Sequence, residues 1–305
     1  MSGRDGDPRT FTYFVGIGLG HSLSPPLHDF VSYSLDLGWK FKVEECARVE
    51  DAIRLFREPT FAGGVITMPY KTAIMEHLDG LDEYCVKIGA CNNVYRAVDG
   101  SLLGSNTDWC GVEACLATAS SNGKGKPALI VGAGGAARAA IYALHERLNC
   151  NPIYVVNRDK GEVDALLLDT KSYGPNLSLV HLDTLTMARD VSQALSPFYI
   201  VGCVPDFKPQ SAEELEGWEI LTYFLQTTTQ KGVLLDLCYK PRRTRLIQMG
   251  DQYNWHVIEG IMVVGRQVQE QYRLWCGEDI ANKISLEEAW KVLQKAAENS
   301  RAINF

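Results

Sequence analysis

A glycine-rich run in the middle of the sequence, VGAGGAAR at residues 131–138, has the composition of a phosphate-binding loop. It fits G-x-G-x-x-(G/A) directly after an apolar run and at the start of a helical one, the context that dinucleotide binding requires. Glycines allow a tight turn and let a pyrophosphate approach the N–H groups at the helix start. A glycine-rich turn without a ligand is the alternative. The run predicts a dinucleotide site formed by Gly132, Ala133, Gly134, Gly135 and Ala136.

The run NRDK at residues 157–160 follows the next apolar run, where the ribose of the adenosine half would lie. Arg158 and Lys160 could bind a 2′-phosphate through charge-assisted hydrogen bonds. Asp159 would repel that phosphate and could accept a hydrogen bond from a free 2′-hydroxyl. A solvated loop accounts for Lys160 equally well. This segment, which also contains Asn157, is predicted to bind the cofactor. It is compatible with both NAD and NADP and slightly favours NAD.

Small polar side chains recur in four runs of the first third of the sequence: HSLSP (21–25), TMPYK (67–71), GACNN (89–93) and GSNTD (104–108). We expect these runs to lie where strands and turns meet. Taken singly, each also has a structural interpretation. Ser22 or Ser24 could cap the following helix, Asn106 and Asp108 are ordinary turn residues, and Lys71 could be a solvated charge.

Short apolar runs alternate with helical stretches along most of the chain. Four runs after residue 127 have the composition of strands buried on both faces of a parallel sheet. Near the C-terminus, apolar residues recur from Ile261 to Trp275 at spacings of three and four, as on one face of a long helix. A last helix is predicted to begin at Ser285. The predicted strands are FTYFVGIG (11–18), FKVEEC (41–46), GGVITMP (63–69), NNVYRA (92–97), ALIV (128–131), IYVV (153–156), YIVG (199–202) and LLDL (234–237).

This alternation predicts an α/β protein with two domains, one of them a doubly wound Rossmann domain. Residues 109–259 would form the Rossmann domain. Residues 1–108 and 260–305 would form an N-terminal α/β domain, to which the C-terminal helices return. The run SSNGKGK at residues 120–126 is predicted to be flexible from its composition.

The composition excludes several classes of protein. The 305 residues carry a net charge of −7, which argues against binding to nucleic acid or to an anionic membrane. The sequence contains no apolar stretch of about 18 residues that would span a membrane, and the start MSGRDGDPRT has no apolar leader. Nine cysteines without a CxxC pair are typical of reduced thiols. We therefore expect a cytoplasmic protein.

Taken together and in order, the motifs resemble the shikimate and quinate dehydrogenases. The resemblance rests on HSLSP, VITMPYK, GACNN, NTD, VGAGGAAR, NRD, DLCY and EGIMVVGRQVQ, and it runs from about residue 16 to residue 277. Several polar motifs at family-like spacing in both domains are far more specific than one glycine loop.

The resemblance implies hydride transfer between a nicotinamide cofactor, NAD or NADP, and one ring carbon of a polyhydroxylated cyclic carboxylate, with no metal. Ser22 and Ser24, with Tyr239 across a cleft, would hold the carboxylate. The ring hydroxyls would be held by Thr67, Lys71, Asn92, Asp108 and Gln267. Gly260, in EGIMVVGRQVQ, would join Asn157, Arg158 and Asp159 in binding the cofactor.

Lys71 and Asp108 are the predicted catalytic residues. Oxidation of an alcohol requires a group that accepts the hydroxyl proton as hydride leaves. An ordinary lysine is protonated at neutral pH and is therefore a poor base, and an adjacent carboxylate keeps it protonated. Desolvation in a closed cleft has the opposite effect and favours the neutral amine. We expect Lys71 to be the general acid/base and Asp108 its orienting partner. Asp108 as the base is the alternative.

Three departures from the family pattern bear on substrate and cofactor. GVI at residues 64–66 stands where many members carry Asn-Val, GCV at 202–204 replaces Asn-Ala-Thr, and Asp159 replaces a hydroxyl residue common in NADP-dependent members. These changes favour the quinate-handling branch with NAD, whereas the Ser-x-Ser pair favours shikimate. A dual shikimate/quinate dehydrogenase, monomeric or homodimeric, is therefore expected. A non-catalytic sensor of the same ligands and a Rossmann reductase for another carbonyl compound are the alternatives.

Overall fold

Apolar runs separated by turn residues form two six-stranded sheets in the computed structural model, which describes residues 8–305. The chain divides into two compact units. The first contains the chain up to Asp108 together with Val264–Ile303, and the second contains Trp109–Val263 and the last two residues. The chain crosses from one unit to the other at two helices, α4 (Asp108–Ala119) and α10 (Ile261–Cys276).

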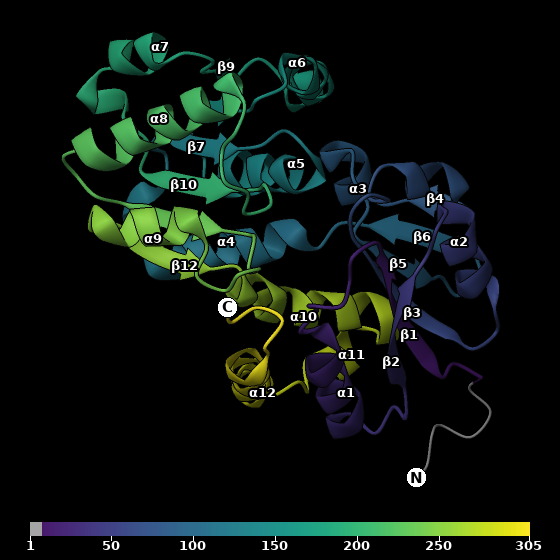
Figure 1. Ribbon diagram of the computed structural model, residues 1–305. Helices are drawn as coiled ribbons and strands as arrows, with labels where there is room; N and C mark the ends of the chain where they lie inside the picture. The colour runs from purple at the N-terminus through teal and green to yellow at the C-terminus, as the bar shows by residue number, and fades with distance from the viewer. Residues whose placement is uncertain (1–7) are drawn as a thin grey trace. The chain divides into compact units, whose positions relative to one another are not determined.

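The first unit contains a mixed sheet with strand order β2-β1-β3-β5-β6-β4. β1 lies parallel to β2 and β3, and β5 lies antiparallel to β3 and β6. Helices α1 and α12 pack side by side, at the two ends of the colour scale (Figure 1). The strands are β1 (Phe11–Gly16), β2 (Lys40–Glu45), β3 (Phe61–Ile66), β4 (Gly80–Leu81), β5 (Asn93–Arg96) and β6 (Leu102–Ser105), and the remaining helices are α1 (Ser24–Ser34), α2 (Val49–Arg57), α3 (Glu83–Ile88), α11 (Glu278–Ala281) and α12 (Leu286–Asn299).

The second unit contains a fully parallel sheet with strand order β12-β11-β10-β7-β8-β9. All residues of β8, β10 and β11 are buried, so both faces of the sheet are covered, as in a doubly wound fold. The strands are β7 (Ala128–Val131), β8 (Ile153–Val156), β9 (Leu179–His181), β10 (Tyr199–Gly202), β11 (Val233–Asp236) and β12 (His256–Glu259), and the helices are α5 (Gly135–Tyr142), α6 (Lys160–Asp169), α7 (Leu185–Asp190), α8 (Ala212–Thr227) and α9 (Arg245–Gln252).

These two sheets confirm the predicted fold class, including the return of the C-terminal helices to the first unit. The run at residues 120–126, predicted to be flexible, makes two contacts with β10. The run contains a 3₁₀ turn over Ser121–Gly123, and a Cβ on Gly123 would lie only 2.2 Å from the Tyr199 ring. The Tyr199 hydroxyl also donates to the carbonyl of Ser120 at 2.5 Å. Ser120 and Gly123 are therefore held against β10, whereas most of the other residues of the run are exposed. No helix within residues 8–305 has the length and apolarity needed to cross a membrane.

Helix α10 packs closely on the sheet of the first unit. Trp275 lies over Gly63 of β3, and its indole N–H donates to Asn93 Oδ1 at 2.9 Å. The Tyr272 hydroxyl donates to the carbonyl of His28 on α1 at 3.0 Å. These contacts fix the helix that carries Gln267, one of the predicted site residues.

Replacing Gly63 with alanine is expected to lower the free energy of unfolding by about 1–3 kcal/mol, the usual cost of overpacking a core. The added Cβ would lie 2.4 Å from two ring atoms of Trp275, so the indole must move. Gly20→Ala is the control, because a Cβ there meets no described atom within 4 Å. Urea denaturation measures the free energy of unfolding of both variants. Equal midpoints for Gly63→Ala and the wild type would contradict this packing.

The His28 ring is fully buried between aromatic rings, with centroids 4.2 Å from Phe41 and 5.7 Å from Tyr272. Burial lowers its pKa from 6.5 to about 3. The unfolded chain therefore binds a proton at His28 between these pH values that the folded chain does not bind. As a result, the free energy of unfolding falls as the pH falls through this window, by up to about 1.4 kcal/mol per pH unit.

Replacing His28 with phenylalanine, which keeps a flat ring but cannot bind a proton, is expected to flatten the pH dependence of stability between about pH 6.5 and pH 4. Thermal unfolding of wild type and variant over this range measures the difference in slope, whatever the absolute stability of the variant. Parallel curves for the two proteins would show that His28 does not control acid stability.

Candidate active site

One edge of the first sheet collects the ends of several strands. β1, β3 and β6 run in the same direction and β5 runs against them, so three carboxyl ends and the amino end of β5 meet there. Thr67 follows β3, Asn92 precedes β5, and Asp108 comes shortly after β6. The strand order therefore brings polar residues from separate runs of the sequence to one place.

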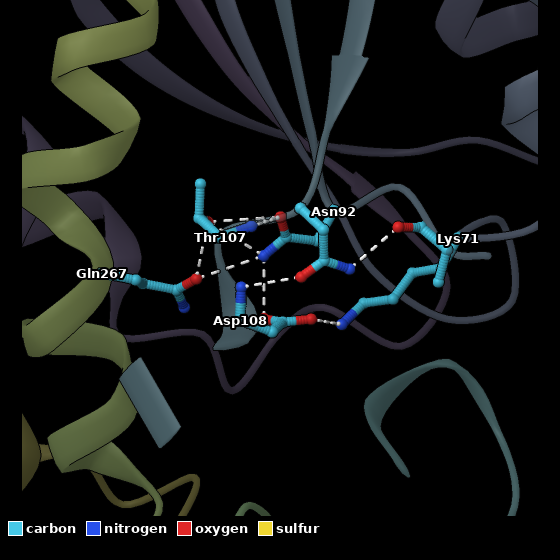
Figure 2. Close-up of polar contacts among 7 residues, drawn as sticks. Lys71, Asn92, Thr107, Asp108 and Gln267 are labelled. Carbon is cyan, nitrogen blue, oxygen red and sulfur yellow. Dashed lines mark hydrogen bonds and ion pairs between the residues drawn. The ribbon is translucent and has the colours of Figure 1, made fainter. Parts of the chain in front are cut away.

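Five side chains at this edge form a hydrogen-bonded network (Figure 2). The Lys71 ammonium forms an ion pair with Asp108 Oδ2. Asn92 Nδ2 donates to the other carboxylate oxygen of Asp108 at 2.8 Å and lies 3.1 Å from Gln267 Oε1. Asn92 Oδ1 accepts from the backbone N–H of Thr107 at 2.6 Å, and the Thr107 hydroxyl donates to Gln267 Oε1 at 2.9 Å. Helix α10 supplies Gln267, so the network joins the strand ends to the C-terminal part of the unit.

The ion pair of this network is shielded from water but still accessible. The Lys71 side chain is 18% exposed and that of Asp108 13%. Lys71 is therefore not the solvated charge that the sequence also allows. The backbone around the pair is fixed, because the Lys71 carbonyl accepts from the Cys91 N–H at 2.6 Å and Asn106 Oδ1 accepts from the Asp108 N–H at 3.0 Å. Partial burial strengthens the attraction between the two charges relative to water.

Ser22, Ser24 and Thr67 belong to the same unit but lie outside this network, among the contacts described. Ser22 Oγ accepts from the backbone N–H of Ser24 at 3.2 Å, so it helps to begin α1. Ser24 is the buried first residue of that helix. Thr67 begins the turn after β3, where its carbonyl accepts from the N–H of Tyr70 at 3.0 Å. Their roles in substrate binding stay predictions.

In the second unit, the glycine loop follows β7 at the point where the strand order reverses, next to β10. Open parallel sheets bind ligands at such a point. Gly132 has a φ of +111° and a Cβ there would lie 2.8 Å from a methyl group of Val204, so only glycine fits. A Cβ on Gly134 would meet no described atom within 4 Å, which leaves open space above the start of α5. Gly135 begins α5, and Ala133 and Ala136 flank the turn. The loop fits a dinucleotide.

The residues after β8 are held by local polar contacts. Asp159 caps α6, where its Oδ1 accepts from the N–H of Glu162 at 3.1 Å. Asn157 Nδ2 donates to the Asp159 carbonyl at 2.9 Å and to the Glu162 carboxylate at 3.0 Å. The Arg158 guanidinium forms an ion pair of 2.5 Å with Glu214 at the start of α8. A cavity of about 260 Å³ lies beside Asn157 and Arg158.

Tyr239 and Gly260 also belong to the second unit, after β11 and β12. A Cβ on Gly260 would lie 2.5 Å from the carbonyl oxygen of Leu237, so close packing of the two strand ends requires glycine. Next to them, burial raises the pKa of Asp236 to about 7, although its carboxylate accepts from the Thr244 hydroxyl at 2.6 Å. Within residues 8–305, no group of His, Cys, Asp and Glu side chains has the arrangement of a metal site.

Two residues of these sites are absent from the predicted set. Thr107 stands inside the NTD run, between Asn106 and the predicted Asp108, so its position was a usable signal. Glu214 is three residues after Ser211, with which it forms a capping box. That spacing predicts a helix start, but it does not reveal that the carboxylate reaches Arg158 from a different part of the chain.

Comparisons with known proteins identify the relatives of this chain. Residues 14–94 match the model of the shikimate dehydrogenase substrate binding domain. A quinate dehydrogenase from Emericella nidulans is 37% identical, over 95% of both chains. The pentafunctional AROM polypeptide of Lachancea thermotolerans is 35% identical over 87% of this chain, which spans only 17% of that polypeptide. The structure of shikimate 5-dehydrogenase from Thermus thermophilus, solved with NADP(H) and shikimate, is 27% identical with a TM-score of 0.71, over 94% of this chain and 99% of the other.

The glycine loop at the switch point of a parallel sheet and the polar network of the first unit define an NAD(P)-dependent oxidoreductase. The similarity over nearly the full length then gives the family. The chain belongs to the shikimate and quinate dehydrogenases.

Proposed function

We propose that this enzyme interconverts quinate and 3-dehydroquinate, and shikimate and 3-dehydroshikimate, with NAD as the preferred cofactor. The observation that carries the proposal is the Lys71–Asp108 ion pair, held within a network of amide and hydroxyl groups. The similarity to a quinate dehydrogenase over 95% of the chain supports quinate as a substrate. A sensor of the same ligands would have no use for a proton donor paired with a carboxylate.

The substrates are small and carry many hydroxyl groups, so a site for them needs many converging donors and acceptors. A missing partner leaves a buried polar group unpaired, which is the basis of discrimination. We assign substrate binding to residues 1–108 and 260–305, and cofactor binding to residues 109–259. The carboxylate is assigned to Ser22, Ser24 and Tyr239, and the ring hydroxyls to Thr67, Lys71, Asn92, Asp108 and Gln267.

Lys71 is the proposed general acid/base. As an ammonium paired with Asp108, it donates a proton to the ring carbonyl oxygen during reduction, and the neutral amine takes that proton back during oxidation. Asp108 cannot turn freely, since Asn92 binds its second oxygen at 2.8 Å. The fixed carboxylate therefore orients the lysine, and Asp108 as the base is the alternative.

The second unit would hold the dinucleotide without any metal. The cofactor supplies the hydride chemistry, and the protein supplies orientation and the proton. The pyrophosphate is assigned to the loop of Gly132, Ala133, Gly134, Gly135 and Ala136, and the remaining contacts to Asn157, Arg158, Asp159 and Gly260. The preference for NAD rests on Asp159, whose carboxylate follows β8 where a 2′-phosphate would be repelled.

Steady-state kinetics with quinate and shikimate, each with NAD and NADP, test the proposal. We expect activity on both substrates and a kcat/KM for NAD at least tenfold above that for NADP, a difference of about 1.4 kcal/mol. Asp159→Ser should narrow the cofactor preference. A tenfold preference for NADP would overturn the cofactor assignment, and the absence of turnover with both ring acids would overturn the substrate assignment.

We also infer that the enzyme works in the cytoplasm. The thiols of Cys46, Cys85, Cys91, Cys150 and Cys238 are free in the structure, as is usual in a reducing compartment.

A further inference from the structure

The ion pair between Arg158 and Glu214 joins two segments of the second unit. Arg158 follows β8, whereas Glu214 lies in the first turn of α8, which follows β10. Nη1 of the guanidinium lies 2.5 Å from Glu214 Oε1. The Arg158 side chain is 66% exposed and that of Glu214 is 23% exposed, so the glutamate is the more buried partner.

Glu214 is held by the backbone at the start of α8. Its second carboxylate oxygen accepts from the N–H groups of Gln210 at 2.8 Å and Ser211 at 3.2 Å. Its own N–H donates to the Ser211 hydroxyl at 3.2 Å, which completes a capping box. These backbone bonds and the guanidinium lower the pKa of Glu214 to about 2. The carboxylate is therefore a fixed negative charge that determines where the Arg158 guanidinium points.

The pairing changes what Arg158 can offer to a nucleotide. A guanidinium binds a phosphate through N–H groups in its plane, in a fork that matches two oxygens. In this protein Glu214 already accepts from Nη1, and Asp159 and Glu162 add further negative charge around the same guanidinium. The flat face of the guanidinium does not take part in these bonds and can stack on an aromatic base.

We propose that Glu214 is a positioning residue that holds Arg158 for stacking and withholds its N–H groups from a 2′-phosphate, so that it selects NAD against NADP. The inference rests on the proposed function, in which Asp159 favours NAD. It adds a residue that lies 56 positions further along the sequence and acts through Arg158.

Glu214→Gln tests the proposal, because glutamine still completes a capping box while the charge is lost. The probes are adenosine 2′,5′-bisphosphate and adenosine 5′-phosphate, titrated by calorimetry. The ratio of their affinities is expected to rise about tenfold in favour of the 2′-phosphorylated probe. The ratio of kcat/KM for NADP to that for NAD should rise in parallel. Should this variant not fold, Glu214→Asp keeps the charge but shortens its reach, and it should raise the ratio by a smaller factor.

Two controls separate the ion pair from a general change of charge. Glu213→Gln removes the same charge from the same helical turn, where Glu213 is held by its own backbone and Ser211 instead of Arg158. In an Arg158→Ala background, Glu214→Gln should leave the probe ratio unchanged. The proposal is overturned if the probe ratio does not rise with Glu214→Gln, or if it rises equally with Glu213→Gln. It is also overturned if the rise persists in the absence of Arg158. A higher kcat/KM for NADP than for NAD in the wild type would instead overturn the cofactor assignment. The probe ratios of the variants would then still decide the role of Glu214.

Discussion

Replacing Lys71 with alanine is expected to lower kcat by about 10²–10⁴-fold, the usual contribution of a general acid/base. The ring carbonyl oxygen would then receive no proton from the protein as hydride arrives. Substrate binding should survive in weakened form, because Asn92, Asp108 and Gln267 still bind one another. Steady-state kinetics in both directions, with quinate and shikimate, measure kcat and KM separately.

Removal of Lys71 also leaves the Asp108 carboxylate without its cation, so loss of activity has to be separated from loss of structure. Lys71→Met keeps most of the side-chain volume, and its melting temperature reports whether the network survives. Lys40→Ala, on the exposed start of β2, is the control for loss of one positive charge. If Lys71→Ala kept a normal kcat and only raised KM, Lys71 would be a binding residue and not the proton donor.

Gly134→Val is expected to raise the Kd for the dinucleotide by about two orders of magnitude, or about 2.7 kcal/mol. A side chain at this position would project into the open space above the start of α5, where the glycine loop lets a pyrophosphate approach the backbone. The fold should tolerate the change, since the added Cβ meets no described atom within 4 Å. Calorimetric titration with NAD and with NADP measures the loss.

The contrast with Gly132 makes this result specific. Gly132→Val introduces strain at a positive φ and a clash with Val204, so it should lower the melting temperature as well as the affinity. Gly134→Val should lower the affinity alone. If Gly134→Val bound NAD as tightly as the wild type does, the dinucleotide would not lie over this loop.

Three of the four inner strands of the second sheet could be predicted to the residue, and the fourth, β11 (Val233–Asp236), begins one residue before the predicted run LLDL. β7, β8 and β10 coincide with the apolar runs ALIV, IYVV and YIVG, because strands buried on both faces have continuous apolar sequences. The edge strands β9 and β12 were missed. They include histidine or glutamate and are partly exposed, so they carry no such pattern.

The site could be predicted as a set of residues but not as an arrangement. Lys71, Asn92 and Asp108 stand out because lysine, amide and carboxylate groups lie near strand ends in short polar runs. Their meeting depends on strand order, which a single sequence does not contain. Gln267 shows the same limit, since helical periodicity predicts α10 but not that it returns to Asn92 across 175 positions of sequence. Gln267 belongs to the predicted site because of the family resemblance, and not because of the helical periodicity.

The division of the first unit between the two ends of the chain affects the order in which the protein can fold during synthesis. Val264–Ile303 belongs to this unit and is synthesised after Trp109–Val263 of the second unit. Until then, Gly63 has no indole over it and Asn93 lacks the N–H of Trp275. The second unit is continuous apart from its last two residues and can collapse as it is made. The parallel sheet can therefore form before the first unit is complete, whereas the contact of Gln267 with Asn92, next to Lys71, requires that Val264–Ile303 has been made.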